Sequence, residues 1–343
     1  MSTQAPIRTS STLTSIRWHK PLLWIGAAMV PLVIVCILGM AVDPRTLGGV
    51  GVWEKPLKFA LSTIIYAVTW SWLIGQLDRF RRVAWWAGTI SAVMLAIELV
   101  IITGAAAGGV TSHFNVSSPL ATVLWSVMAA SITTLWIATF VVSVILFRNG
   151  LGDPARTLAI RGGAVIALVG MGLAFLMTGP TADQLNDFQG IAGAHAVGLA
   201  DGGPGLPILG WSTVGGDLRI PHFVGMHALQ VIPLFLIALE FASRRIHRLR
   251  SSEIRRGLVA IAIAAYSAFL VVLTVQAIMG QSIVRPDATV IATSITIVVL
   301  AIGSGALVVL RGGTPSGNTA SATVPVYTDS DSPGSSTVNS LPH

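Results

Sequence analysis

The sequence predicts an all-α fold, a polytopic helical membrane bundle of about eight transmembrane helices with both termini in the cytoplasm. Three observations support this class. Only 10% of the 343 residues are charged, less than half the share that a soluble domain carries. Hydrophobic residues make up 53% of the chain, and the mean hydropathy is +0.77. The apolar residues also form runs near the length of roughly 20 residues that a helix needs to span a bilayer.

The apolar runs define a transmembrane domain over residues 21–310. The polar segments on either side, 1–20 and 311–343, are rich in Ser and Thr, and we expect them to be disordered. The first run is too long for the apolar part of a signal peptide, so we expect it to remain as a helix. We place the spans at about 21–42, 57–75, 83–104, 119–147, 159–178, 221–242, 257–280 and 288–310.

The basic residues indicate the orientation. With both termini inside, the inner segments hold sixteen of the 21 Lys and Arg residues and the outer segments hold five. Cytoplasmic loops carry this excess of positive charge. Because the charges lie in short clusters between apolar runs, the net charge of +7 does not indicate a nucleic-acid-binding surface. The predicted partners are the lipid bilayer of the cytoplasmic membrane and a small-molecule ligand from the outer side.

The longest outer segment, residues 179–220, is a candidate lid. It is rich in glycine, yet it contains the apolar stretch 206–209. Non-helical backbone at membrane depth must be buried in protein, so we expect a lid or a short re-entrant piece over a site. The alternative is that the outer polar residues are interfacial anchors and helix caps.

Two segments show a weak internal similarity. Residues 54–59 (EKPLKF) and 218–223 (LRIPHF) each combine a basic residue, a proline and a phenylalanine, and each begins the second helix in a group of four. This suggests a parallel repeat of four plus four helices, as some transporters have. Chance is the alternative, because proline is common at helix starts.

Histidines on the outer side form the first candidate site. His222 and His227 lie five residues apart, on different faces of one helix, and are therefore a poor pair of ligands for one small metal. His227 and Gln230 share a face, and an imidazole beside an amide suits a cofactor or a quinone oxygen. A b-type haem needs two axial histidines from different helices, and His113 offers another. The alternative is that these residues join helices by hydrogen bonds, and no spacing matches a known metal motif.

The second candidate site begins on the second predicted helix. Lys58, Tyr66 and intervening hydroxyl residues recur at helical spacing and form one polar stripe. Lys55 and Lys58, near a helix N-terminus, suit an anionic substrate or headgroup, and we add Arg219 and Asp217 to this substrate site. For Lys55 the favoured alternative is a side chain that snorkels to the membrane surface. For the stripe, the alternative is an ordinary packing face between helices.

Glu98 is the third feature. It is the acidic residue most clearly enclosed by an apolar run, about 9 Å from the outer end of its predicted helix. An ionisable group at this depth marks a functional site by default. We expect it to bind substrate or carry a proton, and to be either protonated or paired with Lys58, Arg219 or Arg285. The alternative is a structural ion pair.

The segments 53–59 (WEKPLKF) and 222–230 (HFVGMHALQ) resemble segments of uncharacterised bacterial multi-pass membrane proteins, in the form WxKPxKF and HFxGxHxxQ. The resemblance covers the membrane core rather than the two tails. It implies a bacterial inner membrane, and it brings no activity or catalytic residue with it.

Three classes of function follow, and the sequence leaves open whether the chain is an enzyme. The first is a redox or cofactor-binding protein, with haem b or a quinone at the histidine site. The second is a proton-coupled transporter, with Glu98 as the proton carrier and Lys58 or Arg219 as the anion contact. The third is a non-catalytic assembly or signalling component. The outer histidines favour the first class, the possible repeat favours the second, and the lack of a recognised motif favours the third.

Overall fold

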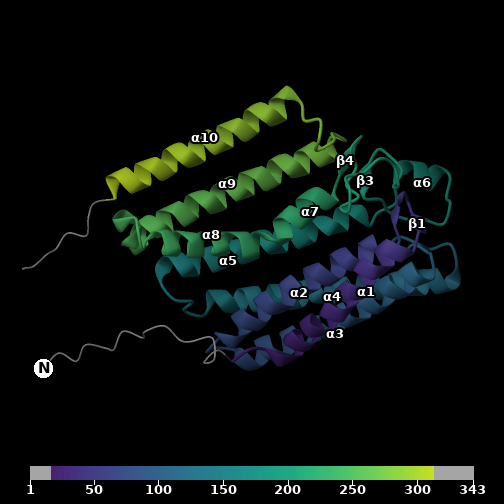
Figure 1. The fold of residues 1–343 in the computed structure, drawn as a ribbon, viewed down its shortest axis with the longest axis horizontal. Coiled ribbons are helices and arrows are strands. Elements are labelled where there is room, and N and C mark those ends of the chain that lie inside the picture. The colour runs from purple at the N-terminus through teal and green to yellow at the C-terminus, as the bar shows by residue number, and fades with distance from the viewer. Residues whose placement is uncertain (1–16, 313–343) are drawn as a thin grey trace, which may run out of the picture.

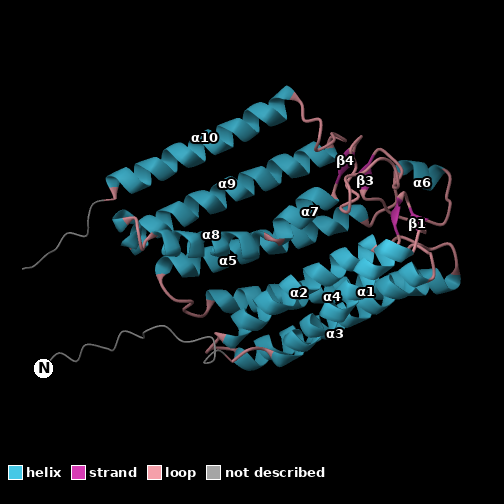
Figure 2. Cartoon of the chain, viewed as in Figure 1, coloured by secondary structure: helices cyan, strands magenta, loops and turns pink. Residues whose placement is uncertain are grey.

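The computed structural model describes residues 17–312, which form a bundle of long helices capped at one end by short strands and loops (Figure 1, Figure 2). The shorter elements are α6 (Ala182–Asn186) and two antiparallel strand pairs, β1 (Thr46–Leu47) with β2 (Val50–Gly51) and β3 (Ala196–Val197) with β4 (Gly216–Asp217). The main helices are α1 (Lys20–Val42), α2 (Glu54–Gly75), α3 (Arg81–Ala107), α4 (Pro119–Phe147), α5 (Pro154–Gly172), α7 (Arg219–Met226), α8 (Ala228–Ala242), α9 (Ser252–Ile278) and α10 (Ala288–Arg311).

The helices are those of an integral, multi-pass membrane protein. In the described residues, seven spans are each long and apolar enough to cross a bilayer, and α7 with α8 makes an eighth across a 46° bend. The outermost helix, α10, has no buried residue. A helix that is apolar all round and uncovered by protein is suited to lipid rather than water. The predicted all-helical class is confirmed.

Three predicted spans differ from the observed helices. One of them, 257–280, begins earlier, at Ser252, where the Ser251 side chain caps the helix. The fifth, 159–178, begins earlier, at Pro154, because the Asp153 side chain accepts a backbone hydrogen bond from the first turn at 2.9 Å and caps the helix. The sixth, 221–242, is two helices that meet at His227. The segment expected to be one long loop before it contains α6, β3 and β4.

The described chain starts ahead of the first predicted span. Residues 1–16 and 313–343, where the sequence predicts disorder, lie outside the described part.

His19 is buried, and its Nδ1 atom accepts a hydrogen bond from the Leu22 backbone at 3.3 Å. Its Nε2 atom donates to the Trp85 carbonyl at 2.9 Å, which ties the start of α1 to α3. Burial lowers the pKa of His19 and so favours the neutral ring that this bonding requires.

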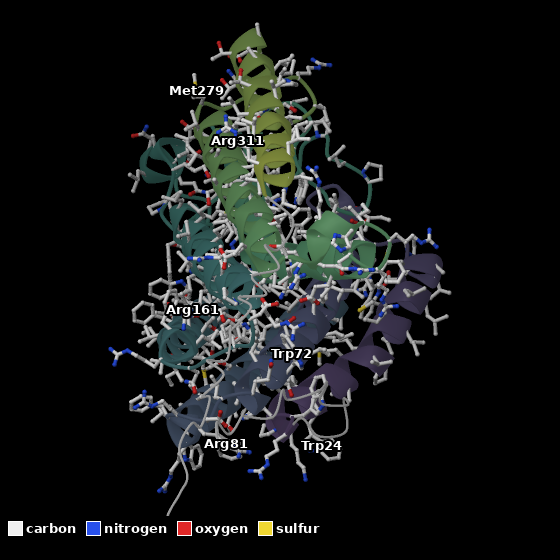
Figure 3. The ribbon with its side chains drawn as sticks, turned by 90° about the vertical axis from the view of Figure 1, so that its left-hand side faces the viewer. Trp24, Trp72, Arg81, Arg161, Met279 and Arg311 are labelled. Atoms are coloured by element: carbon white, nitrogen blue, oxygen red, sulfur yellow. The ribbon has the colours of Figure 1, made fainter. Side chains whose placement is uncertain are left out.

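The two ends of the bundle are unlike (Figure 1). The capped end holds the four strands, α6 and the long connections. The arginine-rich end holds the connections 76–80, 148–153 and 243–251, together with Lys20 and Arg311 at the ends of α1 and α10. Figure 3 looks onto this second end, where the labelled Arg81, Arg161 and Arg311 come from three different helices.

The two halves of the chain repeat one packing pattern. In the first half α1 packs on α2 and α3, α2 packs on α3, and α4 packs on α3. In the second half α5 takes the place of α1, the α7–α8 pair that of α2, α9 that of α3, and α10 that of α4. An antiparallel strand pair precedes the second helix in each half. This arrangement agrees with the parallel four-plus-four repeat, for which the sequence offers only weak support.

One core joins the two halves. A single buried cluster contains Ala67 of α2, Ala164 of α5 and Leu229 of α8. The Gln230 side-chain amide of α8 also donates to Thr69 Oγ1 of α2 at 3.1 Å. The second helices of both halves therefore contact each other inside the bundle.

Glycines allow α5 and α7 to cross at backbone contact. A Cβ atom on Gly170 would overlap the backbone of Gly225. The Gly170 carbonyl accepts a hydrogen bond from His222 Nδ1 at 2.8 Å, and Tyr266 Oη of α9 donates to the Val224 carbonyl at 2.6 Å. The short helix α7 is therefore held by α5 on one side and α9 on another.

We expect Gly170→Ala to destabilise the protein by roughly 1–3 kcal/mol, because the added Cβ overpacks this crossing. The matched control is Gly172→Ala on the same helix, where an added Cβ meets Trp136 Nε1 at an ordinary 3.9 Å. Thermal unfolding of the detergent-purified variants measures both effects. Equal melting temperatures for the two variants would contradict the backbone crossing.

Candidate functional site

A folded turn lies over the capped end. We define the lid as residues 199–215. Within it, the Leu206 N–H donates to the Trp211 carbonyl and the Gly210 N–H donates to the Leu206 carbonyl, both at 2.8 Å. Ile208 adopts a left-handed backbone conformation with φ of 65°, which is unusual for a β-branched residue. The apolar stretch that the sequence places in a lid is thus an ordered turn whose conformation needs support from its surroundings.

Two cationic side chains hold the tip of the lid. Lys58 Nζ of α2 donates to the carbonyls of Ile208 and Leu209 at 2.8 and 2.9 Å. Arg219, at the start of α7, donates from Nη2 to the carbonyl of Gly210. The second helix of each half therefore supplies one cation to the same turn. At the lid both cations bond to uncharged oxygens, which are weaker acceptors than a carboxylate or a phosphate.

Asp217 orients Arg219. Its side chain is fully buried and accepts hydrogen bonds from Arg219 Nε at 2.9 Å and Nη2 at 2.6 Å. It also accepts the Ser212 backbone N–H at 2.8 Å. These protein groups engage the carboxylate that the sequence assigns to a substrate site. In the structure, Asp217 positions Arg219 and anchors the base of the lid.

Lys55 is a residue that the sequence offers as an anion contact but interprets first as a snorkelling side chain. It is half-buried in the first turn of α2, within electrostatic range of Lys58, Arg219, Asp201 and Glu98. Its position three residues before Lys58 places both side chains on one helical face. That spacing favours the anion contact over the snorkelling side chain.

Glu98 is buried within α3, with 3% of its surface exposed. Its Oε1 atom has no hydrogen-bond partner within the described chain. The charged group that acts on it is Lys55, rather than the Lys58, Arg219 or Arg285 that the sequence suggests. Lys58 is directed away because the lid carbonyls engage its ammonium group. A buried carboxyl group with an unsatisfied oxygen calls for a proton or a ligand.

The deeper part of the α2 stripe joins helices. Tyr66 Oη and Thr139 Oγ1 of α4 share a hydrogen bond of 2.7 Å, and Thr69 accepts the Gln230 amide of α8. The alternative role, a packing face between helices, accounts for these contacts of Tyr66, which the sequence also assigns to a substrate site. Two buried oxygens, Ser62 Oγ and Gln230 Oε1, lack a hydrogen-bond partner among residues 17–312.

His113 and His195 both pack on Phe114, with ring centroids 6.0 and 5.0 Å from its own. Burial, together with the nearby Lys55 charge, holds the pKa of His113 well below its usual range. Burial also lowers the pKa of His195, even though its Nδ1 donates to Asp201 at 2.6 Å. Both rings are therefore neutral at pH 7.

His222 and His227 occupy different surroundings. Phe223 contacts both rings, with centroid distances of 5.3 and 6.5 Å. His222 bonds to the Gly170 carbonyl of α5, whereas His227 lies at the break between α7 and α8, beside Gln230. In the described chain, no group of three or more His, Cys, Asp or Glu side chains is arranged to hold a metal ion.

His195 and His222 lie within electrostatic range of each other. Each donates its Nδ1 hydrogen to an oxygen, His195 to Asp201 and His222 to Gly170. A neutral ring bonded in this way presents an unprotonated Nε2 atom. Neighbouring acceptors impose the same tautomer on histidines that bind a metal. Sequence reasoning counts His195 among the outer histidines but does not pair it with His222, because nothing in the long loop shows that His195 folds back toward α7.

No protein-family model matches the chain, and comparisons with curated proteins and with solved structures give no match. Its function is therefore argued from the geometry of these residues.

We expect Arg219→Met to loosen the lid, because it removes the cation on Gly210 and leaves Asp217 buried without its partner. Hydrogen exchange at the Leu206 and Gly210 amides should become at least about tenfold faster. The control is Arg285→Met, which removes an exposed cation at the same end of the bundle. Faster hydrogen exchange throughout the chain, rather than in the lid alone, would show that Arg219 does not act specifically on the lid.

The neutral state of His113 links stability to pH. An unfolded histidine titrates near pH 6.5, and the folded ring titrates lower. Its contribution to stability is therefore complete above about pH 6.5 and is lost as the pH falls below that value. His113→Phe keeps a ring among Phe59, Phe114 and Trp125, and it should reduce the fall in melting temperature between about pH 7 and 5. The control is His247→Phe at an exposed position. If the melting temperature of His113→Phe depends on pH as that of the wild type does, His113 does not link stability to pH.

Proposed function

We propose that this protein is a proton-coupled transporter of a small anionic molecule in the bacterial cytoplasmic membrane, with its capped end facing outward. The orientation is supported by the concentration of arginine at the opposite end of the bundle. The function is supported above all by one observation: Lys58 and Arg219, from the second helices of the two halves, converge on one turn of the lid.

The lid contacts suggest how an anion would be admitted. The carbonyl oxygens of Ile208, Leu209 and Gly210 occupy positions beside Lys58 and Arg219 where oxygens of a carboxylate or phosphate would also bond. Charge-assisted hydrogen bonds to an anion are roughly twice as strong as those to a neutral oxygen. An anion that reaches these cations therefore competes with the lid tip and releases it. In this proposal, the conformation in which Lys58 and Arg219 hold the lid is the closed one.

The deeper residues suggest how binding would be coupled to protons. Lys55 acts on both the lid cations and Glu98, so the charge state of Glu98 affects an anion held at the lid. Buried carboxyl groups serve as proton carriers in transporters. The α7–α8 span is also broken at His227, and transporters of repeated architecture place their sites at broken helices. Glu98 is the proton carrier in this proposal.

Binding is tested first, with succinate as a carboxylate probe and inorganic phosphate as a phosphate probe. Either anion at millimolar concentration should raise the melting temperature and speed hydrogen exchange in the lid. Lys58→Met should weaken that binding by about tenfold or more, the value of one charge-assisted hydrogen bond. Arg285→Met should not. If both anions leave lid exchange unchanged in the wild type, the proposed anion site is wrong.

Coupling is tested in proteoliposomes, with uptake of the bound anion measured with and without a pH gradient. Glu98→Gln should keep anion binding and lose the dependence on the gradient. The control is Glu253→Gln, whose side chain is 74% exposed at the arginine-rich end. Uptake that still responds to the gradient in Glu98→Gln would remove Glu98 from the mechanism.

A second candidate function is cofactor binding, favoured by the unprotonated Nε2 atoms of His195 and His222. These two residues would hold a haem iron from opposite segments of the chain, and a bound haem would supply electron transfer. His227 and Gln230 are the residues for a quinone oxygen in this alternative. An optical spectrum of the purified protein, before and after dithionite, tests haem directly. A Soret band lost in His222→Ala supports this function, and a spectrum without one opposes it.

A further inference from the structure

A groove of about 690 Å³ lies toward the arginine-rich end, remote from the lid. It runs between α5 and α9, and Phe147 at the end of α4 forms part of its rim. Arg161, labelled in Figure 3, lies in it together with Arg256. The groove takes no part in the function proposed above, so an inference about it does not depend on that function.

The mouth of the groove is cationic. Arg161 donates from Nη2 to the carbonyls of Phe147 and Asn149 at 3.1 and 3.0 Å, while its buried Nε atom has no partner in residues 17–312. Arg256 faces Glu253 at 3.7 Å, in a pair whose side chains are both more than half exposed. Exposed ion pairs of this kind are weak. The Arg256 guanidinium is therefore suited to an incoming phosphate, and Arg161, which also stacks on the Phe147 ring at 5.2 Å, adds positive charge to the same groove.

The rest of the groove is largely apolar. Leu158, Val165 and Ile263 line its walls, and Ser267 lies at its far end. From Arg256 to Ser267 the α9 helix rises by about 16 Å. This length is close to half of the roughly 30 Å hydrocarbon core of a bilayer. The groove thus matches one membrane leaflet in length and polarity. Its arginine end is charged, and the rest, which we call the trough, is an apolar channel lined by Leu158, Val165 and Ile263.

We propose that this groove binds one anionic phospholipid from the leaflet at the arginine-rich end. The lipid phosphate lies at Arg161 and Arg256, and one acyl chain lies along Val165 and Ile263. Basic pockets between transmembrane helices on the cytoplasmic side hold anionic headgroups, and that leaflet is negatively charged. A free phosphate would meet the same two arginines, but it would leave the trough unfilled. The trough therefore favours the lipid.

The test is native mass spectrometry of the full chain in detergent. Phosphatidylglycerol and phosphatidylcholine with identical acyl chains are titrated separately. The wild type should prefer phosphatidylglycerol, and Arg256→Gln should reduce that preference by about fivefold, the effect of one basic residue. The matched control is Arg245→Gln, an exposed arginine at the same end outside the groove. Val165→Trp fills the trough and should weaken binding of both lipids.

Several outcomes would overturn the proposal. Equal binding of the two lipids to the wild type would remove the phosphate site. An equal loss of preference in Arg245→Gln and Arg256→Gln would show a general effect of surface charge. Unchanged lipid binding by Val165→Trp would remove the trough. Displacement of phosphatidylglycerol by inorganic phosphate at millimolar concentration would show that the arginines bind the anion without the acyl chain.

Discussion

The buried ion pair between Asp217 and Arg219 is the interaction on which the capped end depends. Asp217 is enclosed by protein, so its charge is tolerable only while Arg219 and the Ser212 backbone satisfy it. The same pair joins the end of β4 to the start of α7, and it directs the remaining donor of Arg219 to the lid at Gly210. The lid, the entrance of α7 and the position of His222 therefore depend on one desolvated contact.

The Asp217–Arg219 pair lies at the capped end because of the repeat of the two halves. Each half brings a strand pair and the first turn of its second helix to the capped end, so Lys58 and Arg219 reach the lid from opposite halves. The second helices also differ. α2 is continuous, whereas the α7–α8 span bends at His227 and is held by the backbone crossing of Gly170 with Gly225. The asymmetry places an irregular backbone segment on one side of the proposed anion site only.

The candidate site was predictable where it depends on local spacing and depth. Glu98 stands out because charged residues are rare in apolar runs, and Lys58 and Arg219 stand out as cations at the outer ends of such runs. The structure places all three in or beside one electrostatic cluster with Lys55. The pairing within that cluster was not predictable. Glu98 is acted on by Lys55 because the lid carbonyls engage Lys58, a contact between residues 150 positions apart in the chain. His195 reaches the site by a similar long-range fold of the loop.

The sequence alone determined the helical membrane class, the approximate spans and the arginine-rich end, because each follows from hydrophobicity and charge summed over many neighbouring residues. Tertiary structure decided the break at His227, the ordered lid and the partners of Asp217, Lys55 and the histidines. Those features come from contacts between residues far apart in the chain. Whether a hydrogen bond or a glycine crossing forms depends on how the helices pack against one another, and local composition does not specify that packing.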